Sequence, residues 1–432
     1  MCRFIVPIAL SITAFASGAL AQGSWGAPPP AMEQAGSTAS PSAAPLTLAA
    51  AVQLALDNNP ELSSARREIE ATEGARVQAG AFPNPTMNVE VEDLRRDTRT
   101  TTVLLSQPLE LGGKRGARIE AAERAIDVAR AQLDAKQADL RASVTAAFFA
   151  TAISQERVRL AEASLELART GSSAAGKRVT AGKISPVEET RAKVAEANVR
   201  LELVQARGEL QTNLQLLRAL TTRQAGIDAV NGDVLSIPSS APQETLEERI
   251  MNAPSLRQAR LEVRRYGALS EVERAKRIPD ITVSAGAKRD QEIGRNQAVI
   301  GISVPLPIFD TNRGNITEAL RRQDKAEDDA RALELRLRAD VGAARQRLLT
   351  ASAEVEALQK EILPGAQSAF DAATKGFELG KFSYLDALDA QRTLLQARSQ
   401  YLRSLAEAHK SVTDLDRLLG GAFANGVTAS TP

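Results

Sequence analysis

Side chains that commonly carry out catalysis or hold metal ions are scarce in this chain. Its 432 residues include one histidine, His409, and one cysteine, Cys2. Metal and nucleophilic sites need histidine, cysteine or carboxylate groups in clusters, whereas the carboxylates here are distributed along helical patterns. A glycine-rich phosphate-binding loop is also absent from the sequence. The chain is therefore predicted not to be an enzyme and to need no cofactor and no resident metal ion, and His409 is interpreted as a helix-packing or surface residue.

The acidic groups of most interest lie where long helical patterns begin. Glu188 and Glu189 follow Ser185-Pro186, in which serine is a plausible N-cap and proline suits the first helical position. Asp386 and Asp389 follow Ser383 in the same way. Acidic residues in a first turn interact favourably with the helix dipole, and this role alone could explain all of them.

Both acidic groups belong to segments that match each other. Ala181-Gly182-Lys183-Ile184-Ser185-Pro186-Val187-Glu188 and Leu379-Gly380-Lys381-Phe382-Ser383-Tyr384-Leu385-Asp386 lie 198 residues apart (379 − 181). Other proline and glycine positions match collinearly at similar spacing: Pro60 with Pro254, Phe82-Pro83 with Ile278-Pro279, Pro108 with Pro305, and Arg115-Gly116 with Arg313-Gly314. Because such residues punctuate structure, their shared register indicates an internal tandem duplication within one pseudo-symmetric body.

Composition and the N-terminus narrow the class of protein. With 54 basic and 53 acidic residues the net charge is +1, which gives no support for a nucleic-acid partner. Residues 1–21 resemble a secretory signal peptide: Arg3, an apolar stretch from Phe4 to Leu20, and Ala19-Leu20-Ala21 as the cleavage site. Cys2 would leave with it, so no lipidated cysteine is expected. Residues 22–45 are predicted to be a disordered leader.

Each repeat is predicted to combine helices with a pair of strands. The first repeat spans 46–235, with two short helices in 46–79 and strands near 85–93 and 100–109, and the second spans 236–420, with strands near 280–288 and 298–306, followed by a tail at 421–432. Met87, Val89 and Val91 alternate with polar residues. A soluble hairpin with one wet face and a membrane-crossing hairpin both fit this alternation. Four strands cannot close a barrel, but three chains would supply twelve.

A very long helix follows each strand pair. Seam positions recur every seven residues: Ile119, Ile126, Leu133, Leu140 and Ala147 in the first repeat, and Leu337, Ala344, Ala351 and Leu358 with Val341, Leu348, Val355 and Ile362 in the second. The first long helix is expected over 116–170, with tips near 171–186 and 377–384. The helix at 255–276 is expected to continue the returning helix at 185–220, and the helix at 60–79 to continue that at 381–418.

With these features the chain resembles outer-membrane efflux channels of the TolC type. The segment Phe377-Glu378-Leu379-Gly380-Lys381-Phe382-Ser383-Tyr384-Leu385-Asp386-Ala387-Leu388-Asp389-Ala390 is similar to the family's most recognisable motif. The resemblance implies a mainly α fold with a small β part: a homotrimer with a twelve-stranded transmembrane barrel, four strands per chain, and a long helical periplasmic tunnel. It also implies that the tips meet a periplasmic adaptor, a membrane fusion protein. Adaptor-contact candidates are Gly182, Lys183, Ile184, Ser185, Gly380, Lys381, Phe382 and Ser383.

The resemblance also implies an acidic pore constriction at the second tip. Asp386 and Asp389 match its positions, and Glu188 matches an acidic position of the first tip, although Arg191 stands where a second acid would be expected. Three copies of each carboxylate would concentrate cations and disfavour anions. The competing interpretation remains the helix-dipole role.

Two further stretches resemble the cobalt-zinc-cadmium resistance subgroup: Gln107-Pro108-Leu109-Glu110-Leu111-Gly112-Gly113-Lys114-Arg115, and Val304-Pro305-Leu306-Pro307-Ile308-Phe309-Asp310. This implies a passive exit duct for cobalt, zinc and cadmium ions, with nickel as a further candidate, in the outer membrane of a Gram-negative bacterium. Its partners would be the adaptor, an inner-membrane RND pump reached through the adaptor, and outer-membrane lipid. Multidrug efflux, type I secretion and a non-channel coiled-coil adaptor are the alternatives.

Overall fold

The computed structural model describes residues 45–222, 226–238 and 242–421, all of which belong to one compact unit. The predicted signal peptide (1–21), the predicted leader apart from its last residue, and the predicted tail apart from its first residue lie outside the described residues. No helix within the described ranges has the length and apolar character needed to cross a membrane.

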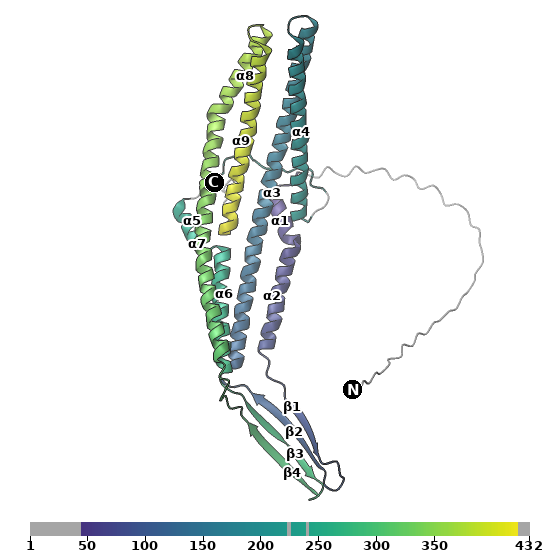
Figure 1. Ribbon diagram of the computed structural model, residues 1–432, viewed down its shortest axis with the longest axis vertical. Helices are drawn as coiled ribbons and strands as arrows, with labels where there is room; N and C mark the ends of the chain where they lie inside the picture. The colour runs from purple at the N-terminus through teal and green to yellow at the C-terminus, as the bar shows by residue number, and fades with distance from the viewer. Residues whose placement is uncertain (1–44, 223–225, 239–241, 422–432) are drawn as a thin grey trace, which may run out of the picture. The chain divides into compact units, whose positions relative to one another are not determined.

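Helices dominate the fold, and four strands form one small sheet (Figure 1). In chain order the elements are α1 (Leu48–Asn58), α2 (Pro60–Ala79), β1 (Thr86–Glu92), β2 (Thr100–Leu109), α3 (Lys114–Thr180), α4 (Pro186–Leu220), α5 (Gln243–Met251), α6 (Pro254–Lys276), β3 (Ile281–Asp290), β4 (Arg295–Ser303), α7 (Arg313–Ala357), the π-helical turn η1 (Leu358–Ile362), α8 (Leu363–Glu378) and α9 (Tyr384–Leu419). The order of the first six elements recurs in the second half, as the duplication predicts.

The first long helix, α3, is longer than its sequence suggests. It continues without a break to Thr180, whereas the turn was expected from Gly171 onward. Gly171 and Gly176 therefore lie inside the helix. A glycine inside a helix costs about 1 kcal/mol relative to alanine, a penalty that packing along a 67-residue helix can offset.

The predicted heptad seam of the second repeat is buried along its long helix, except at its last position. Leu337, Val341, Ala344, Leu348, Ala351, Val355 and Leu358 are all buried, as the seven-residue period predicts. Ile362, predicted to continue the series, is 48% exposed. The reason is the π-helical turn η1, in which the Leu363 N–H bonds to the Leu358 carbonyl five residues back. The wider turn shifts the seam by one residue, so the buried face resumes at Leu363 and Ala366.

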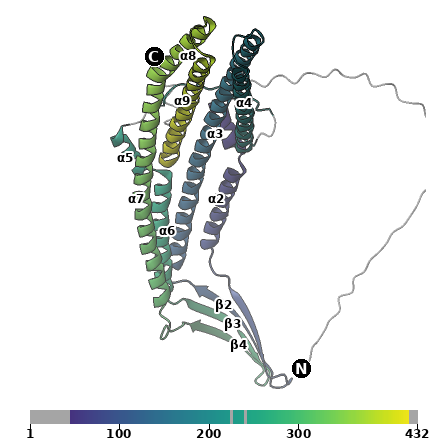
Figure 2. The ribbon, with the colours of Figure 1, turned by 45° about the horizontal axis from the view of Figure 1, so that its top comes forward.

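The returning helices are continued within each repeat, and not across repeats as predicted. The end of α9 packs with α5 and the start of α6 around Leu415, Leu419 and Leu256. The end of α4 shares a core with α1 and the start of α2, including Leu217, Ala55 and Leu62. Both views show α6 beyond the end of α9 and α2 beyond the end of α4 (Figures 1 and 2). Helix α1 packs apolar side chains against the junction of α4 with α2. Helix α5 does the same at the junction of α9 with α6.

The sheet is antiparallel in the order β1-β2-β3-β4, so β2 and β3 join the two repeats. Strand β4 spans Arg295–Ser303, earlier than the predicted 298–306, and it ends two residues before Pro305. Paired residues lie on the same face. One face carries Met87, Val89, Leu105, Ile300 and Ile302, all more than half exposed, and the other carries mainly polar residues.

Candidate functional site

The two helical turns farthest from the sheet share one backbone geometry. Gly182 and Gly380 adopt φ values of 67° and 71°, in the left-handed region that favours glycine. The N–H groups of Gly182 and Lys183 donate to the carbonyls of Val179 and Arg178, both at 2.9 Å. Gly380 and Lys381 make the equivalent bonds to Phe377 and Gly376. Each turn is therefore a Schellman motif that ends one long helix sharply.

The helices that leave these turns are capped differently. Ser185 Oγ accepts a hydrogen bond from Val187 N at 3.3 Å, and Pro186 begins α4. At the second turn Ser383 and Asp386 form a capping box, in which the Asp386 carboxylate accepts from Ser383 N at 2.9 Å and from Ser383 Oγ at 2.8 Å. These bonds lower the pKa of Asp386 below 3.8. Asp386 is therefore a charged helix cap at neutral pH.

The other acidic candidates differ in their surroundings. Asp389 is exposed, one turn beyond Asp386, and its carboxylate makes no ion pair with another described residue. Glu188 is half-buried, and its neighbour Glu189 forms an ion pair with Lys193 at 2.6 Å. The structure thus places Asp386 and Asp389 together at the second tip, and Glu188 at the first tip. Of the two acids at the second tip, Asp389 is therefore the one whose carboxylate is not engaged in capping bonds.

The adaptor-contact candidates form two exposed loops. Gly182, Lys183, Ser185, Gly380, Lys381, Phe382 and Ser383 are exposed, and Ile184 is half-buried. A Cβ built on Gly182 or Gly380 has no heavy atom within 4 Å, so side chains there would project into solvent. Phe382 is 51% exposed, which leaves half of its ring available at the surface.

Arg178 connects the two tips, a role that its sequence position does not reveal. Its guanidinium lies 3.9 Å from the centroid of the Phe377 ring and donates to the Phe377 carbonyl at 3.1 Å and the Glu378 carbonyl at 3.4 Å. These carbonyls belong to the C-terminal turn of α8, where the helix dipole favours a cation. Arg178 therefore holds the end of α8 against α3.

A small apolar cluster supports the same contact. Tyr384, Ala175 and Ala192 are buried together, and Ile184, Phe377 and Leu388 pack against them. Burial raises the pKa of Tyr384. The only available sequence signal for this cluster was the aromatic pair within the second-tip motif, because sequence alone does not say which surface Phe377 and Tyr384 face.

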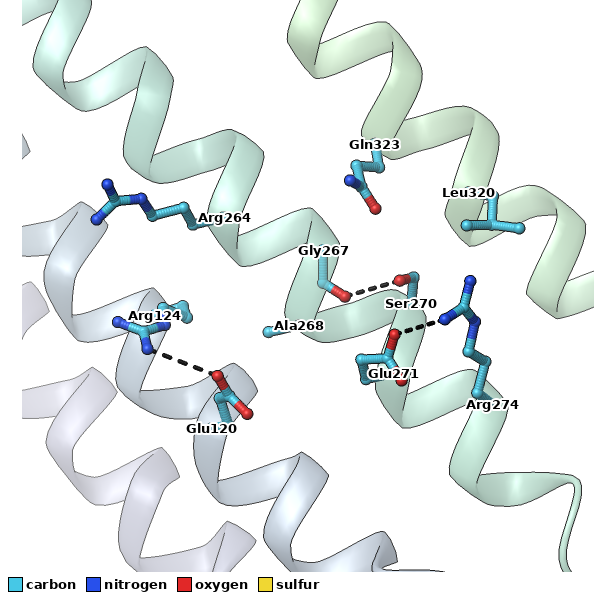
Figure 3. Close-up of a pocket in the computed structure, with 10 residues that line it drawn as sticks. All are labelled: Glu120, Arg124, Arg264, Gly267, Ala268, Ser270, Glu271, Arg274, Leu320 and Gln323. Atoms are coloured by element: carbon cyan, nitrogen blue, oxygen red, sulfur yellow. Dashed lines mark hydrogen bonds and ion pairs between the residues drawn. The ribbon is translucent and has the colours of Figure 1, made fainter.

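A groove near the sheet end of the helices is the alternative site (Figure 3). It has a volume of about 630 Å³ and lies between α3, α6 and α7. Its two acids pair with arginines on their own helices, Glu120 with Arg124 at 3.5 Å and Glu271 with Arg274 at 2.8 Å. These pairs leave no concentrated charge for a small ion. The groove is therefore a weaker candidate than the tips.

His409 packs inside the helical wall, as interpreted from the sequence. It is 4% exposed, its ring stacks on Phe149 at 4.2 Å, and its Nε2 lies 3.0 Å from the Val234 carbonyl. Burial lowers its pKa, which favours the neutral ring.

Known proteins with similar sequences belong to a family of outer-membrane efflux proteins. The profile of the family described as outer membrane efflux protein matches residues 51–223 and 245–421, one match per repeat. The chain is 48% identical over 379 residues to the cobalt-zinc-cadmium resistance protein CzcC of Cupriavidus metallidurans, covering 88% of this chain and 91% of CzcC. It is 27% identical over 278 residues to the nickel-cobalt-cadmium resistance protein NccC of Alcaligenes xylosoxydans xylosoxydans, covering 63% of each.

A solved structure supports the same architecture. The outer membrane protein VceC from Vibrio cholerae superposes with a TM-score of 0.73 at 20% identity, covering 87% of this chain and 96% of VceC. The fold is that of a TolC-type channel subunit. The chain belongs to the outer membrane efflux protein family.

Proposed function

We propose that this chain is the outer-membrane channel of a tripartite RND-type efflux system and the passive exit duct for divalent heavy-metal cations. The observation that carries the proposal is the 48% identity to CzcC over 88% of the chain. Similarity to NccC extends the candidate ions from cobalt, zinc and cadmium to nickel. Because the chain offers a duct and no convergent metal ligands among its described residues, ion selection would reside in the pump or the adaptor.

The sheet supports assembly as a trimer in the outer membrane. Within the described residues β1 and β4 are edges, each hydrogen-bonded to one neighbour. Unpaired edges are unstable in lipid, and pairing β4 of one subunit with β1 of the next would close three sheets into twelve strands. The apolar face with Met87, Leu105 and Ile300 would then contact lipid, and the polar face would line the channel.

The tips are suited to receive an adaptor. Both are short and exposed, and their backbone geometry is fixed by Schellman motifs, so a partner would meet two similar surfaces in each subunit. Lys183 and Lys381 occupy corresponding positions beside the glycines. An adaptor with acidic or carbonyl groups at its own helical turns would complement these lysines.

Asp389 and Asp386 would form the acidic constriction. In a trimer each would contribute three carboxylates at the channel entrance, and the depressed pKa of Asp386 keeps its charge at neutral pH. A ring of this kind raises the local concentration of cations. Asp389 would contribute more, because the Asp386 carboxylate is occupied by its capping bonds.

Growth of a deletion strain tests the proposed cargo. The strain, with and without plasmid-borne wild-type protein, is grown on zinc, cobalt, cadmium and nickel salts and separately on a panel of drugs. We expect restored growth on the divalent metals and no difference on the drugs. Restoration on drugs alone would retain the channel and overturn the cargo. Localisation of the protein in outer-membrane fractions as a heat-modifiable trimer distinguishes a channel from a periplasmic adaptor.

A further inference from the structure

The apolar face of the sheet carries different residues at its two ends, one near the helices and the other at the strand-to-strand turns. Across the four strands its rows include Met87-Leu105-Ala285-Ile300 and Val89-Val103-Ala287-Ala298. The next row toward the strand-to-strand turns is Val91-Thr101-Arg289-Asn296. The face is therefore free of charge within β1–β4 until Arg289, which lies at the end farthest from the helices.

Aromatic residues are found at only one end of this face. The four strands contain no Phe, Tyr or Trp. At the end near the helices, Phe82 is 71% exposed and Phe309 is 99% exposed. Membrane barrels ordinarily carry aromatic girdles at both interfaces. The turns β1–β2 and β3–β4 at the other end also lack aromatic residues, so a different contact must anchor that side.

Two arginines, Arg99 and Arg289, lie on the apolar face at the end near the strand-to-strand turns. Gln291 N donates to the Arg99 carbonyl at 3.1 Å, which extends the β2–β3 ladder by one pair and puts Arg99 in alternation with Thr101, on the apolar face. Arg99 and Arg289 are exposed, and neither forms an ion pair with any described residue. The Arg289 guanidinium makes one weak bond, to Asn296 Oδ1 at 3.4 Å.

The acids within the strands lie on the opposite face of the sheet. Glu90, Glu92 and Asp290 alternate onto the polar face, where Glu92 pairs with Lys288 at 3.6 Å. In the turns, the Asp93 carboxylate bonds to Thr98 Oγ1 at 2.5 Å and to Arg95 N at 3.0 Å, and Asp290 accepts from Glu292 N at 3.0 Å. The apolar face thus ends in positive charge that its own strands do not neutralise.

We propose that Arg99 and Arg289 bind the phosphate groups of a phosphorylated glycolipid in the outer leaflet of the outer membrane. The proposal rests on the orientation given by the proposed function, in which the helices are periplasmic and the strand turns face outward. Guanidinium groups bind phosphate through paired, charge-assisted hydrogen bonds, and acyl chains of the same lipid would cover the apolar rows. The two arginines would replace an outer aromatic girdle as the anchor.

Native mass spectrometry of the full chain, purified as a trimer in nonionic detergent, tests the proposal. The probes are lipid A with both phosphates and the same lipid A after dephosphorylation. We expect the wild type to bind the phosphorylated form about tenfold more tightly, a difference that one charge-assisted contact can supply. Arg99→Gln with Arg289→Gln should abolish this preference, and Arg99→Lys with Arg289→Lys should keep part of it.

Arg295→Gln is the matched control, because Arg295 lies opposite Asp290 in the β3–β4 ladder, on the polar face. It should retain the full preference. Equal binding of both lipid forms by the wild type would overturn the proposal, as would preference retained in the double glutamine variant. Failure of the metal growth test with lipid preference intact would remove the cargo and leave the lipid site. A chain found outside the outer-membrane fraction would remove both.

Discussion

The two helical hairpins descend from one duplicated unit but differ in continuity. In the first, α3 runs unbroken for 67 residues to its tip. In the second, the corresponding path is divided into α7, η1 and α8, with Pro364 as the second residue of α8. A proline inside an α-helix clashes with the carbonyl four residues earlier, and the wider π turn relieves that clash. The helix axis can therefore change direction between α7 and α8. The first hairpin has no such break between its tip and the rest of α3.

The two tips also differ in the residues at one matching position. In the second, the Phe382 ring lies over Gly376, where a Cβ would come within 2.2 Å of a ring atom. The position that corresponds to Gly376 in the first repeat is Arg178, which reaches across to the carbonyls of α8. Duplication thus produced two similar turns with complementary surfaces. The first tip ends an unbroken helix and supplies Arg178, and the second carries Asp386, Asp389 and the bend.

The largest expected difference between the hairpins is the loss of unfolding free energy when a buried side chain is truncated. Leu348 lies in the long helix of the second repeat and Thr151 in that of the first, and each is fully buried. Leu348→Ala leaves a cavity, and we expect it to lower the free energy of unfolding by about 2–5 kcal/mol. Thr151→Ala removes one hydrogen bond to the Ala147 carbonyl and should cost about 1 kcal/mol. Denaturant unfolding of the purified proteins measures both, and equal losses would contradict the comparison.

Loss of the left-handed glycines should weaken both tips to a similar degree. A leucine at Gly182 and at Gly380 would be held in a conformation that costs about 1–2 kcal/mol per residue and would project into the adaptor surface. We expect the double leucine variant to bind adaptor several-fold more weakly and to lose metal resistance. The matched double asparagine variant should retain most function, since asparagine tolerates this region. Normal resistance in the leucine variant would remove the adaptor role of the tips.

Removing the π turn should make the second hairpin resemble the first. Deleting Gln359 and replacing Pro364→Ala would bring Val355 and Leu358 into one heptad frame with Leu363 and Ala366. We expect the variant to fold as a trimer and to show slower amide hydrogen exchange around 356–364. Exchange is measured by mass spectrometry on the purified protein, with Pro364→Ala alone as the control. Unchanged exchange would show that the bend does not depend on the extra residue.

The smallest effect is expected at the acids of the second tip. Asp386→Asn with Asp389→Asn should lower cation preference in planar bilayers while leaving the trimer intact, because both side chains are exposed. Since hydrogen bonds lower the Asp386 pKa in the folded protein, its stabilising contribution persists above 3.8 and is lost only as pH falls through the folded pKa. After correction for the intrinsic pH dependence of amide exchange, the protection factors at the start of α9 should therefore be unchanged from pH 7 to 5 and fall in stronger acid. Unaltered ion selectivity would contradict the pore role.

Local patterns in the sequence determined much of this fold. The a/d period predicted the buried seam up to Leu358, and Ser185-Pro186 predicted the start of α4, since caps and heptads depend on near neighbours in the chain. The matching Gly-Lys turns predicted two tips. Alternation in the strands predicted one apolar face, because successive side chains point to opposite sides.

Tertiary structure decided which of these elements meet. The sequence suggested that the helices 60–79 and 255–276 would continue returning helices of the opposite repeat, but α1 and α5 close each junction within its own repeat through contacts distant in sequence. The shift that exposes Ile362 arises from a single extra residue in the turn before Pro364, which a strict heptad count does not register. The bond from Arg178 to α8 joins residues about 200 positions apart, and only folding brings them together.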